Sequence, residues 1–373
     1  MKKILLIGEY FSSNLGDGVL CTVVENILKH SLNDYAVEIF DLSLNKAFQQ
    51  NDSIKFKLIK KQLSFWKKNA ADRLLKCNQK NKNDLKKFEK LFDQKMKDVN
   101  IIVFPGGQMF NDTFINKISI VVQKAENKGI PVLFNACGFA NYVSNDLLKQ
   151  LKVVLESKVV KMISVRDGYE YIRKMNISCC VSDTGDTALL TNKYFKLYET
   201  KKNIVGLGVM FSKNQSPIAQ IKLWDSILKK IINEKISFKM FCNGNPYDYG
   251  FAKYILKRNG LDEKKYLESN PTTPDQLVNL IYQYNSIISM RLHSLIIATS
   301  FNIPAIAISW DKKVDEFYKK INMKDYCVRV DESGEIILQK LQMLAKKTIC
   351  DKRALELNVE KNIRNLLNTI DDL

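Results

Sequence analysis

Short apolar, β-branched runs alternate with amphipathic stretches along most of this sequence, and the whole pattern occurs twice. Such alternation is typical of parallel sheets whose two faces are covered by helices. A chain of 373 residues also exceeds the usual size of a single hydrophobic core. We therefore predict an α/β fold of two Rossmann-like lobes that face each other across a cleft.

The expected strands form two groups. The first group lies at Lys3–Gly8, Asn100–Phe104, Pro131–Asn135 and Met162–Val165, and the second at Asn203–Val209, Ile236–Cys242, Ser286–Met290, Ala305–Ser309 and Cys327–Val330. The polar segment Asn192–Asn203 separates them and is the expected linker. We place the N-terminal lobe at 1–195, the C-terminal lobe at 203–350 and a terminal helix at 351–373.

The composition narrows the class of protein. Hydrophobic residues make up 46% of the chain and charged residues 26%, which excludes intrinsic disorder and fibrous repeats. The eight cysteines form no CxxC pair and the only histidines are His30 and His293, so we expect no metal site. His30 is typical of a residue near the end of a helix.

No segment resembles a signal peptide or a membrane span. Glu9 interrupts the first apolar run before a signal-peptide core can form. The longest uncharged stretch, Ser294–Trp310, contains Asn302 and Pro304, which favour helix, turn and strand. We expect a cytoplasmic protein with reduced thiols.

The chain carries a net charge of +18, which favours anionic partners. Fifteen basic and four acidic residues fall between Lys55 and Lys97, within a basic helical insertion expected at about 52–98. Because Phe56, Phe65 and Trp66 are interspersed with its lysines, this insertion could lie on an anionic membrane surface at the inner face of the membrane. A solvated helical insertion remains the alternative. No nucleic-acid-binding module is recognisable.

Two glycine-containing loops follow expected strands at the same edge of the first sheet. In the first loop, Asn14, Gly16 and Asp17 precede a helix whose backbone amides suit an anion or a sugar hydroxyl. In the second, Gly106 and Gly107 would let a substrate approach the backbone. A helix cap and tight turns explain the same residues without a ligand, and both interpretations stay open.

Basic residues at strand ends suggest a site for an anion. Arg166 follows one strand and could bind a carboxylate or phosphate, or pair with Asp167. Arg291 and His293 lie where a helix begins, and cations there cost stability unless an anion offsets them. Lys313 follows a later strand and is a further candidate for holding an anionic or sugar ligand.

Taken in order, these motifs resemble the polysaccharide pyruvyl transferase family. The matching segments are Asn14-Leu15-Gly16-Asp17, Gly106-Gly107, Val165-Arg166-Asp167, Asp186-Thr187-Ala188-Leu189 and Arg291-Leu292-His293, with Lys313 after the late strand. The sequence departs from the family pattern at Gly18, Gln108 and Thr187. Because the basic residues of the pattern are retained, these changes concern the identity of the acceptor more than that of the donor.

The resemblance implies a GT-B-like fold with the N-terminal lobe on the acceptor side and the C-terminal lobe on the donor side. It implies transfer of a pyruvyl group from phosphoenolpyruvate to sugar hydroxyls of a cell-surface polysaccharide precursor, free or lipid-linked, without a metal or other cofactor. Arg166 and Arg291 would grip the donor, and His293 would act as catalytic acid or phosphate partner.

Two other functions fit the same sequence features. A glycosyltransferase could place the diphosphate of a nucleotide-sugar donor at the same basic helix start. A non-catalytic adaptor could use the basic insertion to bind a membrane. Thermal stabilisation by phosphoenolpyruvate or by a nucleotide sugar would separate the first alternative from pyruvyl transfer.

Overall fold

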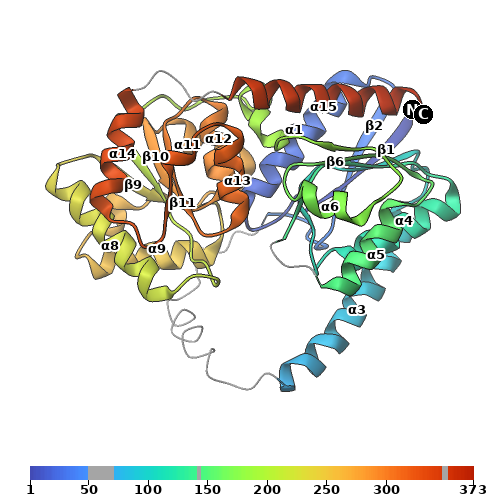
Figure 1. Ribbon diagram of the computed structural model, residues 1–373, viewed down its shortest axis with the longest axis horizontal. Helices are drawn as coiled ribbons and strands as arrows, with labels where there is room; N and C mark the ends of the chain where they lie inside the picture. Colours follow the sequence, from blue (N-terminus) through green and yellow to red (C-terminus); the bar gives the residue numbers. More distant parts are fainter. Residues whose placement is uncertain (49–70, 141–143, 347–351) are drawn as a thin grey trace.

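Two parallel sheets, each surrounded by helices, form the two lobes of the protein (Figure 1). The computed structural model describes residues 1–48, 71–140, 144–346 and 352–373, without the side chains of 71–82. Residues 52–70 of the basic insertion expected at about 52–98 therefore lie outside the described residues. They include Phe56, Phe65 and Trp66, on which the membrane-binding hypothesis depends.

The N-terminal lobe contains the larger sheet, with the strand order β2-β1-β3-β5-β6-β7 and β4 paired to β5. Its strands are β1 Lys2–Gly8, β2 Tyr35–Asp41, β3 Ile101–Phe104, β4 Gly107–Phe110, β5 Val132–Phe139, β6 Val160–Val165 and β7 Val181–Asp183. Its helices are α1 Leu15–Ser31, α3 Ala71–Lys95, α4 Ile115–Lys128, α5 Asn145–Leu155, α6 Tyr169–Met175, the 3-10 helix η1 Thr187–Leu190 and α7 Thr191–Tyr194.

The C-terminal lobe contains a five-stranded sheet with the order β12-β11-β10-β8-β9. Its strands are β8 Val205–Gly208, β9 Phe238–Phe241, β10 Ser286–Ser289, β11 Ala305–Ser309 and β12 Cys327–Arg329. Its helices are α8 Pro217–Asn233, α9 Pro246–Arg258, α10 Glu263–Tyr266, α11 Pro274–Tyr282, α12 Leu292–Ser300, α13 Lys312–Lys320, the 3-10 helix η2 Lys324–Tyr326 and α14 Gly334–Lys346.

The predicted fold class is confirmed. In both lobes the first strand lies beside the second on one side and the third on the other, which is the order of doubly wound sheets. The central strands β3 and β5 are buried from end to end, because helices cover both faces. This burial produces the continuous apolar runs seen in the sequence.

Local sequence signals set several helix starts in the C-terminal lobe. Helices α8, α9 and α11 each begin with a polar residue whose side chain accepts a backbone hydrogen bond, followed by proline, which fits the first turn of a helix. The pairs are Ser216-Pro217, Asn245-Pro246 and Thr273-Pro274. Asp311 caps α13 in the same way.

The lobes are packed against each other. Helix α1 of the N-terminal lobe contacts α11 and α12, and one buried apolar cluster continues from α1 into the C-terminal lobe. Lys320, the last residue of α13, donates hydrogen bonds across the boundary to the carbonyl oxygens of Arg166 at 2.8 Å and Thr184 at 2.7 Å, and to Asp183 at 2.6 Å. This contact fixes α13 over the end of β6.

The terminal helix α15, Arg353–Asp371, returns to the N-terminal lobe and packs on β5, β6 and η1 (Figure 1). Asn362 on α15 donates to buried Asn135 at 2.7 Å. A Cβ on Gly185 would come within 2.8 Å of Leu355 and Val359, so α15 lies directly on the loop before η1.

Candidate functional site

The carboxyl ends of strands from both sheets meet where the lobes touch. Substrates of doubly wound sheets bind at such ends, near the point where the strand order reverses. In the first sheet this point lies between β1 and β3, and in the second between β8 and β10. The loop after β1 and the start of α12 after β10 therefore approach each other.

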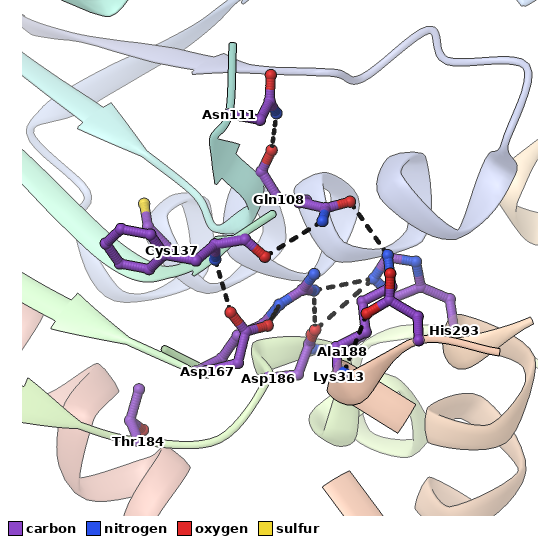
Figure 2. A network of polar contacts seen from close by, with 12 residues as sticks. Gln108, Asn111, Cys137, Asp167, Thr184, Asp186, Ala188, His293 and Lys313 are labelled. Carbon is purple, nitrogen blue, oxygen red and sulfur yellow. Dashed lines mark hydrogen bonds and ion pairs between the residues drawn. The ribbon is translucent and has the colours of Figure 1, made fainter. Parts of the chain in front are cut away.

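Arg166, directly after β6, lies at the centre of a buried polar cluster. Its partners Asp167, Asp186 and His293 are labelled in Figure 2. Its Nε donates to Asp167 Oδ2 at 3.2 Å, and its Nη1 contacts Asp186 and, at 3.3 Å, Nε2 of His293. Burial alone would lower the pKa of Arg166, but the carboxylates of Asp186, Asp167 and Asp17 raise it. The guanidinium is therefore a fixed charge of the site.

His293 is the second residue of α12 and is almost completely buried. Besides Arg166, its Nε2 lies 3.6 Å from Asp186 Oδ2, and its Nδ1 lies 3.6 Å from Asp17 Oδ1. A guanidinium only donates, so a hydrogen bond from Arg166 requires a free lone pair on Nε2. A protonated ring would instead donate from Nε2 to Asp186, so this nitrogen has one partner for each protonation state.

The other side of this imidazole is held by Asn14 and the first turn of α1, which begins at Leu15 and not after Asp17 as expected. Asn14 precedes α1, and its Nδ2 donates to Asp17 Oδ2 at 2.9 Å, which orients the carboxylate toward His293. A Cβ on Gly16 would lie 2.3 Å from the Cβ of His293 and 2.6 Å from its Nδ1. The space left by the absent side chain of Gly16 is thus occupied by the histidine.

Asp186, which the sequence indicates only through the family motif, completes the cluster. It is buried, and its Oδ1 accepts from the amide of Ala188 at 2.9 Å at the start of η1. Burial would raise the pKa of Asp186, but the charge of Arg166 and the hydrogen bond with His293 hold it well below its usual range. This carboxylate remains ionised.

Lys313 enters the site from the C-terminal lobe with neutral partners. Its Nζ donates to Gln108 Oε1 at 3.1 Å (Figure 2). The same nitrogen lies 4.9 Å from the centre of the Trp310 ring. Burial lowers the pKa of Lys313, and Arg166 adds to this effect, although Asp311 opposes it. Gln108, a departure from the family pattern, is therefore part of the cluster.

Gly106 and Gly107 come directly before Gln108 in the chain. Both have positive φ, +119° and +88°, which favours glycine. A Cβ on Gly106 would lie 3.0 Å from the carbonyl oxygens of Asn135 and Ala136. The backbone turn and the neighbouring strand account for these glycines, and their predicted contact with substrate stays a prediction.

Arg291 does not join the Arg166–His293 cluster. It precedes α12, and its Nε donates to Asp248 Oδ2 at 2.8 Å, with Nη2 on the same oxygen. Asp248, on α9, is buried and also accepts from the amide of Phe211 at 3.0 Å. Arg166 and Arg291 therefore pair with different carboxylates and do not converge on one place, as the expected joint binding of a ligand would require.

The anions predicted to offset cations at the start of α12 are protein carboxylates. Asp17 and Asp186 face His293, and Asp248 pairs with Arg291. No local pattern marks Asp248 as a partner of Arg291, because the two residues are 43 positions apart. Asp167 pairs with Arg166, as the alternative interpretation of Arg166 expects, and it also accepts from the amide of Phe139 at 2.6 Å.

Two cavities adjoin the cluster. One of about 240 Å³ opens between α6 and α13, and a second of about 20 Å³ lies against Arg166 and Asp186. Asp167, Lys313 and Glu316 line both. A larger hollow of about 510 Å³ lies over Asp225 and Arg258 on the outer side of the C-terminal lobe, away from the cluster.

Within the described ranges, no group of three or more His, Cys, Asp or Glu residues is arranged to hold a metal ion. In the same part of the chain no helix combines the length and apolar character that crossing a membrane requires.

Two doubly wound lobes with a polar cluster between their strand ends define a two-lobed α/β enzyme of the GT-B type. The family model described as polysaccharide pyruvyl transferase matches residues 14–312. The chain belongs to this family, and the suspected resemblance is confirmed. The chain is therefore an enzyme of the transferase class.

Solved structures share the fold at low sequence identity. MnaA of S. aureus, in a co-structure with UDP, is 12% identical with a TM-score of 0.63, covering 99% of this chain and 96% of its own. UDP-GlcNAc 2-epimerase of Neisseria meningitidis, bound to UDP-GlcNAc, is 13% identical with a TM-score of 0.61, covering 99% and 100%. Trehalose 6-phosphate synthase of Burkholderia multivorans is 7% identical with a TM-score of 0.51, covering 100% and 97%. No curated protein matches the sequence.

Proposed function

We propose that the protein transfers a pyruvyl group from phosphoenolpyruvate to two hydroxyls of a sugar in a cell-surface polysaccharide precursor. Membership of the family supports the class of reaction. The observation that carries the proposal is that Arg166 from one lobe and His293 and Lys313 from the other converge on one buried cluster. A small, highly charged donor needs such groups, fixed before it binds.

Lys313 is the cation best suited to receive the donor. Its present partners, Gln108 and the Trp310 ring, are neutral. A phosphate or carboxylate of the donor would therefore pair with the Lys313 ammonium without first breaking an ion pair. Arg166 is already held by Asp167 and Asp186, which fix the direction of its guanidinium. It would supply a rigid positive field, worth about 10²–10³-fold in rate for groups of this kind.

His293 would move the proton that the reaction requires. Protonation of the enol CH₂ carbon creates an oxocarbenium-like centre at the carbon that bears the phosphate oxygen. One sugar hydroxyl adds to this carbon and releases a proton, which restores the proton spent on the CH₂ carbon. The C–O bond to phosphate then breaks, the second hydroxyl adds to the same carbon and closes the ketal, and its proton passes to the released phosphate. One phosphoenolpyruvate and one diol thus give one ketal and one phosphate, and general acid help from His293 would contribute about 10²–10⁴-fold.

The test is incubation of the purified protein with phosphoenolpyruvate and a panel of free, nucleotide-linked and lipid-linked sugars. We expect a pyruvyl mass increment on an acceptor and release of an equal amount of phosphate. His293→Ala should fold normally and lose transfer, whereas unchanged turnover would remove His293 from the mechanism.

A second set of incubations, with nucleotide sugars, tests the alternative that the protein is a glycosyltransferase. The reason for this choice is that the similar structures include proteins bound to UDP and UDP-GlcNAc. We expect phosphoenolpyruvate to stabilise the protein thermally in the absence of any nucleotide sugar. Glycosyl transfer from a nucleotide sugar, with no effect of phosphoenolpyruvate, would contradict the proposal.

We also propose that residues 55–97 bind an anionic membrane surface and so bring the enzyme to lipid-linked acceptors. Liposome flotation with and without anionic lipid tests it. Equal failure to bind both kinds of liposome would end it, without affecting the proposed reaction.

A further inference from the structure

The cavity of about 240 Å³ is formed jointly by the two lobes. Its walls include Phe139, Asp167 and Tyr171 of the N-terminal lobe and Lys313 and Glu316 of α13. Pockets for drug-sized ligands are larger, about 300–1,000 Å³. The cavity therefore suits one small ring and not an extended chain.

One wall of this cavity is an aromatic platform, defined here as the rings of Phe139 and Tyr171. The rings are stacked with centres 5.5 Å apart and an angle of 27°. Phe139 is buried beneath, while Tyr171 is 42% exposed. Gly168 has φ +67°, and a Cβ there would lie 2.7 Å from the Phe139 ring, so this glycine allows the platform to form.

The inner end of the cavity carries carboxylates. Asp167 is buried beside Arg166, and burial together with the nearby charge of Asp167 raises the pKa of Glu316. Glu170 adds a third carboxylate to the lining, and Lys174, Lys312 and Lys313 balance the three. The cavity as a whole therefore gives no net attraction to a donor with a carboxylate and a phosphate, whereas its hydrogen-bond acceptors and donors suit the hydroxyls of a polyol.

The cavity also adjoins the Arg166–His293 cluster. Asp167, Lys313 and Glu316 line both it and the smaller cavity against Arg166 and Asp186. A ring lying on Tyr171 would direct its inner hydroxyls toward the place where the donor is proposed to bind.

We infer that this cavity is the acceptor subsite, in which one saccharide ring packs on the aromatic platform and its hydroxyls bond to Asp167 and Glu316. A sugar ring has an apolar C–H face that suits the negative face of an aromatic ring and a polar rim that suits carboxylates. The inference rests on the proposed function, because it takes the acceptor to be a sugar.

The test compares Tyr171→Ala, Tyr171→Phe and Glu316→Gln with the control Tyr198→Ala, which removes an exposed tyrosine outside the cavity. In the pyruvyl-transfer assay we expect Tyr171→Ala to raise the acceptor KM about tenfold. Tyr171→Phe should keep the wild-type value, since it retains the ring. Glu316→Gln should raise the acceptor KM without raising the KM for phosphoenolpyruvate, and the control should change neither.

A binding experiment separates failure of the inference from failure of the proposed function. The probes are methyl galactoside, methyl glucoside, UDP-galactose and UDP-GlcNAc, studied by saturation-transfer NMR with and without phosphoenolpyruvate. We expect signal from at least one sugar ring and its loss in Tyr171→Ala. Sugar binding that depends on Tyr171, without pyruvyl transfer, would refute the function and keep the subsite.

Pyruvyl transfer with an unchanged acceptor KM in Tyr171→Ala and Glu316→Gln would keep the function and overturn the subsite. Absence of saturation transfer to every probe, with phosphoenolpyruvate present, would also overturn it.

Discussion

At the scale of single residues, the site depends on how closely side chains of the two lobes approach. Asp17 belongs to the first lobe and His293 to the second, yet their polar atoms lie 3.6 Å apart. Gly16 makes this approach possible, because any Cβ there would overlap His293. Its role is therefore steric and can be tested separately from the charges.

Gly16→Ala should displace the imidazole and lower kcat about 100-fold, since misplacement of a catalytic group by about 1 Å has effects of this size. The overlap is with the Cβ of His293, at 2.3 Å. Thermal stability should therefore recover in Gly16→Ala/His293→Gly but not in Gly16→Ala/His293→Ala. Wild-type turnover in the single variant would contradict this account.

The KM for the donor should rise at alkaline pH, because Lys313 loses its positive charge there. Burial lowers the pKa of Lys313, so the ammonium is lost as pH rises through this lowered value, and donor binding weakens. In Lys313→Arg the charge persists at alkaline pH, so the rise of the donor KM should move to higher pH. Lys319→Arg, on the exposed side of α13, is the control. Identical pH profiles for Lys313→Arg and the wild type would exclude Lys313 as the titrating group.

Glu9, at the end of β1, should make stability depend on pH. Burial and the charge of Asp17 raise the pKa of Glu9 from 4.5 to about 7 in the folded protein. The unfolded chain then releases the proton more readily, so this residue lowers stability progressively as pH rises from about 4.5 to 7. Glu9→Gln should be more stable than the wild type at pH 8 by about 3 kcal/mol and equally stable at pH 4, as measured by urea unfolding. A difference that is the same at both pH values would contradict the assignment.

At the scale of elements, strand burial explains which parts of the fold the sequence predicts. Central strands such as β3 and β11 appear as continuous apolar runs because both faces are covered. The edge strand β2, Tyr35–Asp41, was not predicted, because its residues are only partly buried and include polar ones. β7 is short and lies at the opposite edge, with no apolar run to mark it.

The same reasoning separates the predicted from the unpredicted parts of the site. Residues that follow central strands, such as Arg166 and His293, were predictable, because parallel strands end at a common edge. Partners supplied by distant elements were not. Lys320 and Glu316 lie on a polar helix whose docking depends on the placement of the second lobe, which no local pattern specifies.

The pairing of Arg291 with Asp248 should fasten α12 to α9. Arg291→Met leaves a buried carboxylate without its counter-charge, which typically costs about 3–5 kcal/mol. Adding Asp248→Asn should recover much of this loss, because the neutral amide can still accept from Phe211. Urea unfolding of the two single variants and the double variant measures the coupling. A double variant less stable than Arg291→Met would contradict it.

At the scale of the whole molecule, Lys320 ties the lobes together by three hydrogen bonds. Lys320→Met should lower the free energy of unfolding by about 2–3 kcal/mol, because bonds from a charged group to buried carbonyls are lost. It should also raise the KM values of donor and acceptor together, since α13 carries Lys313 and Glu316. Lys319→Met, with an exposed side chain, should change the free energy by less than about 0.5 kcal/mol. Equal effects of the two variants would show that α13 is held by other contacts.

His293 of the C-terminal lobe lies between Gly16 and Arg166 of the N-terminal lobe. Activity should therefore require both lobes, even if the chain is cut between them. Cutting within residues 196–203 would leave each fragment with a sheet of its own but only part of the reactive cluster. Neither fragment would turn over substrate by itself. Mixed at low concentration, the pair would regain activity in proportion to the product of the two fragment concentrations, so the protein could serve as a split reporter of its own reassembly.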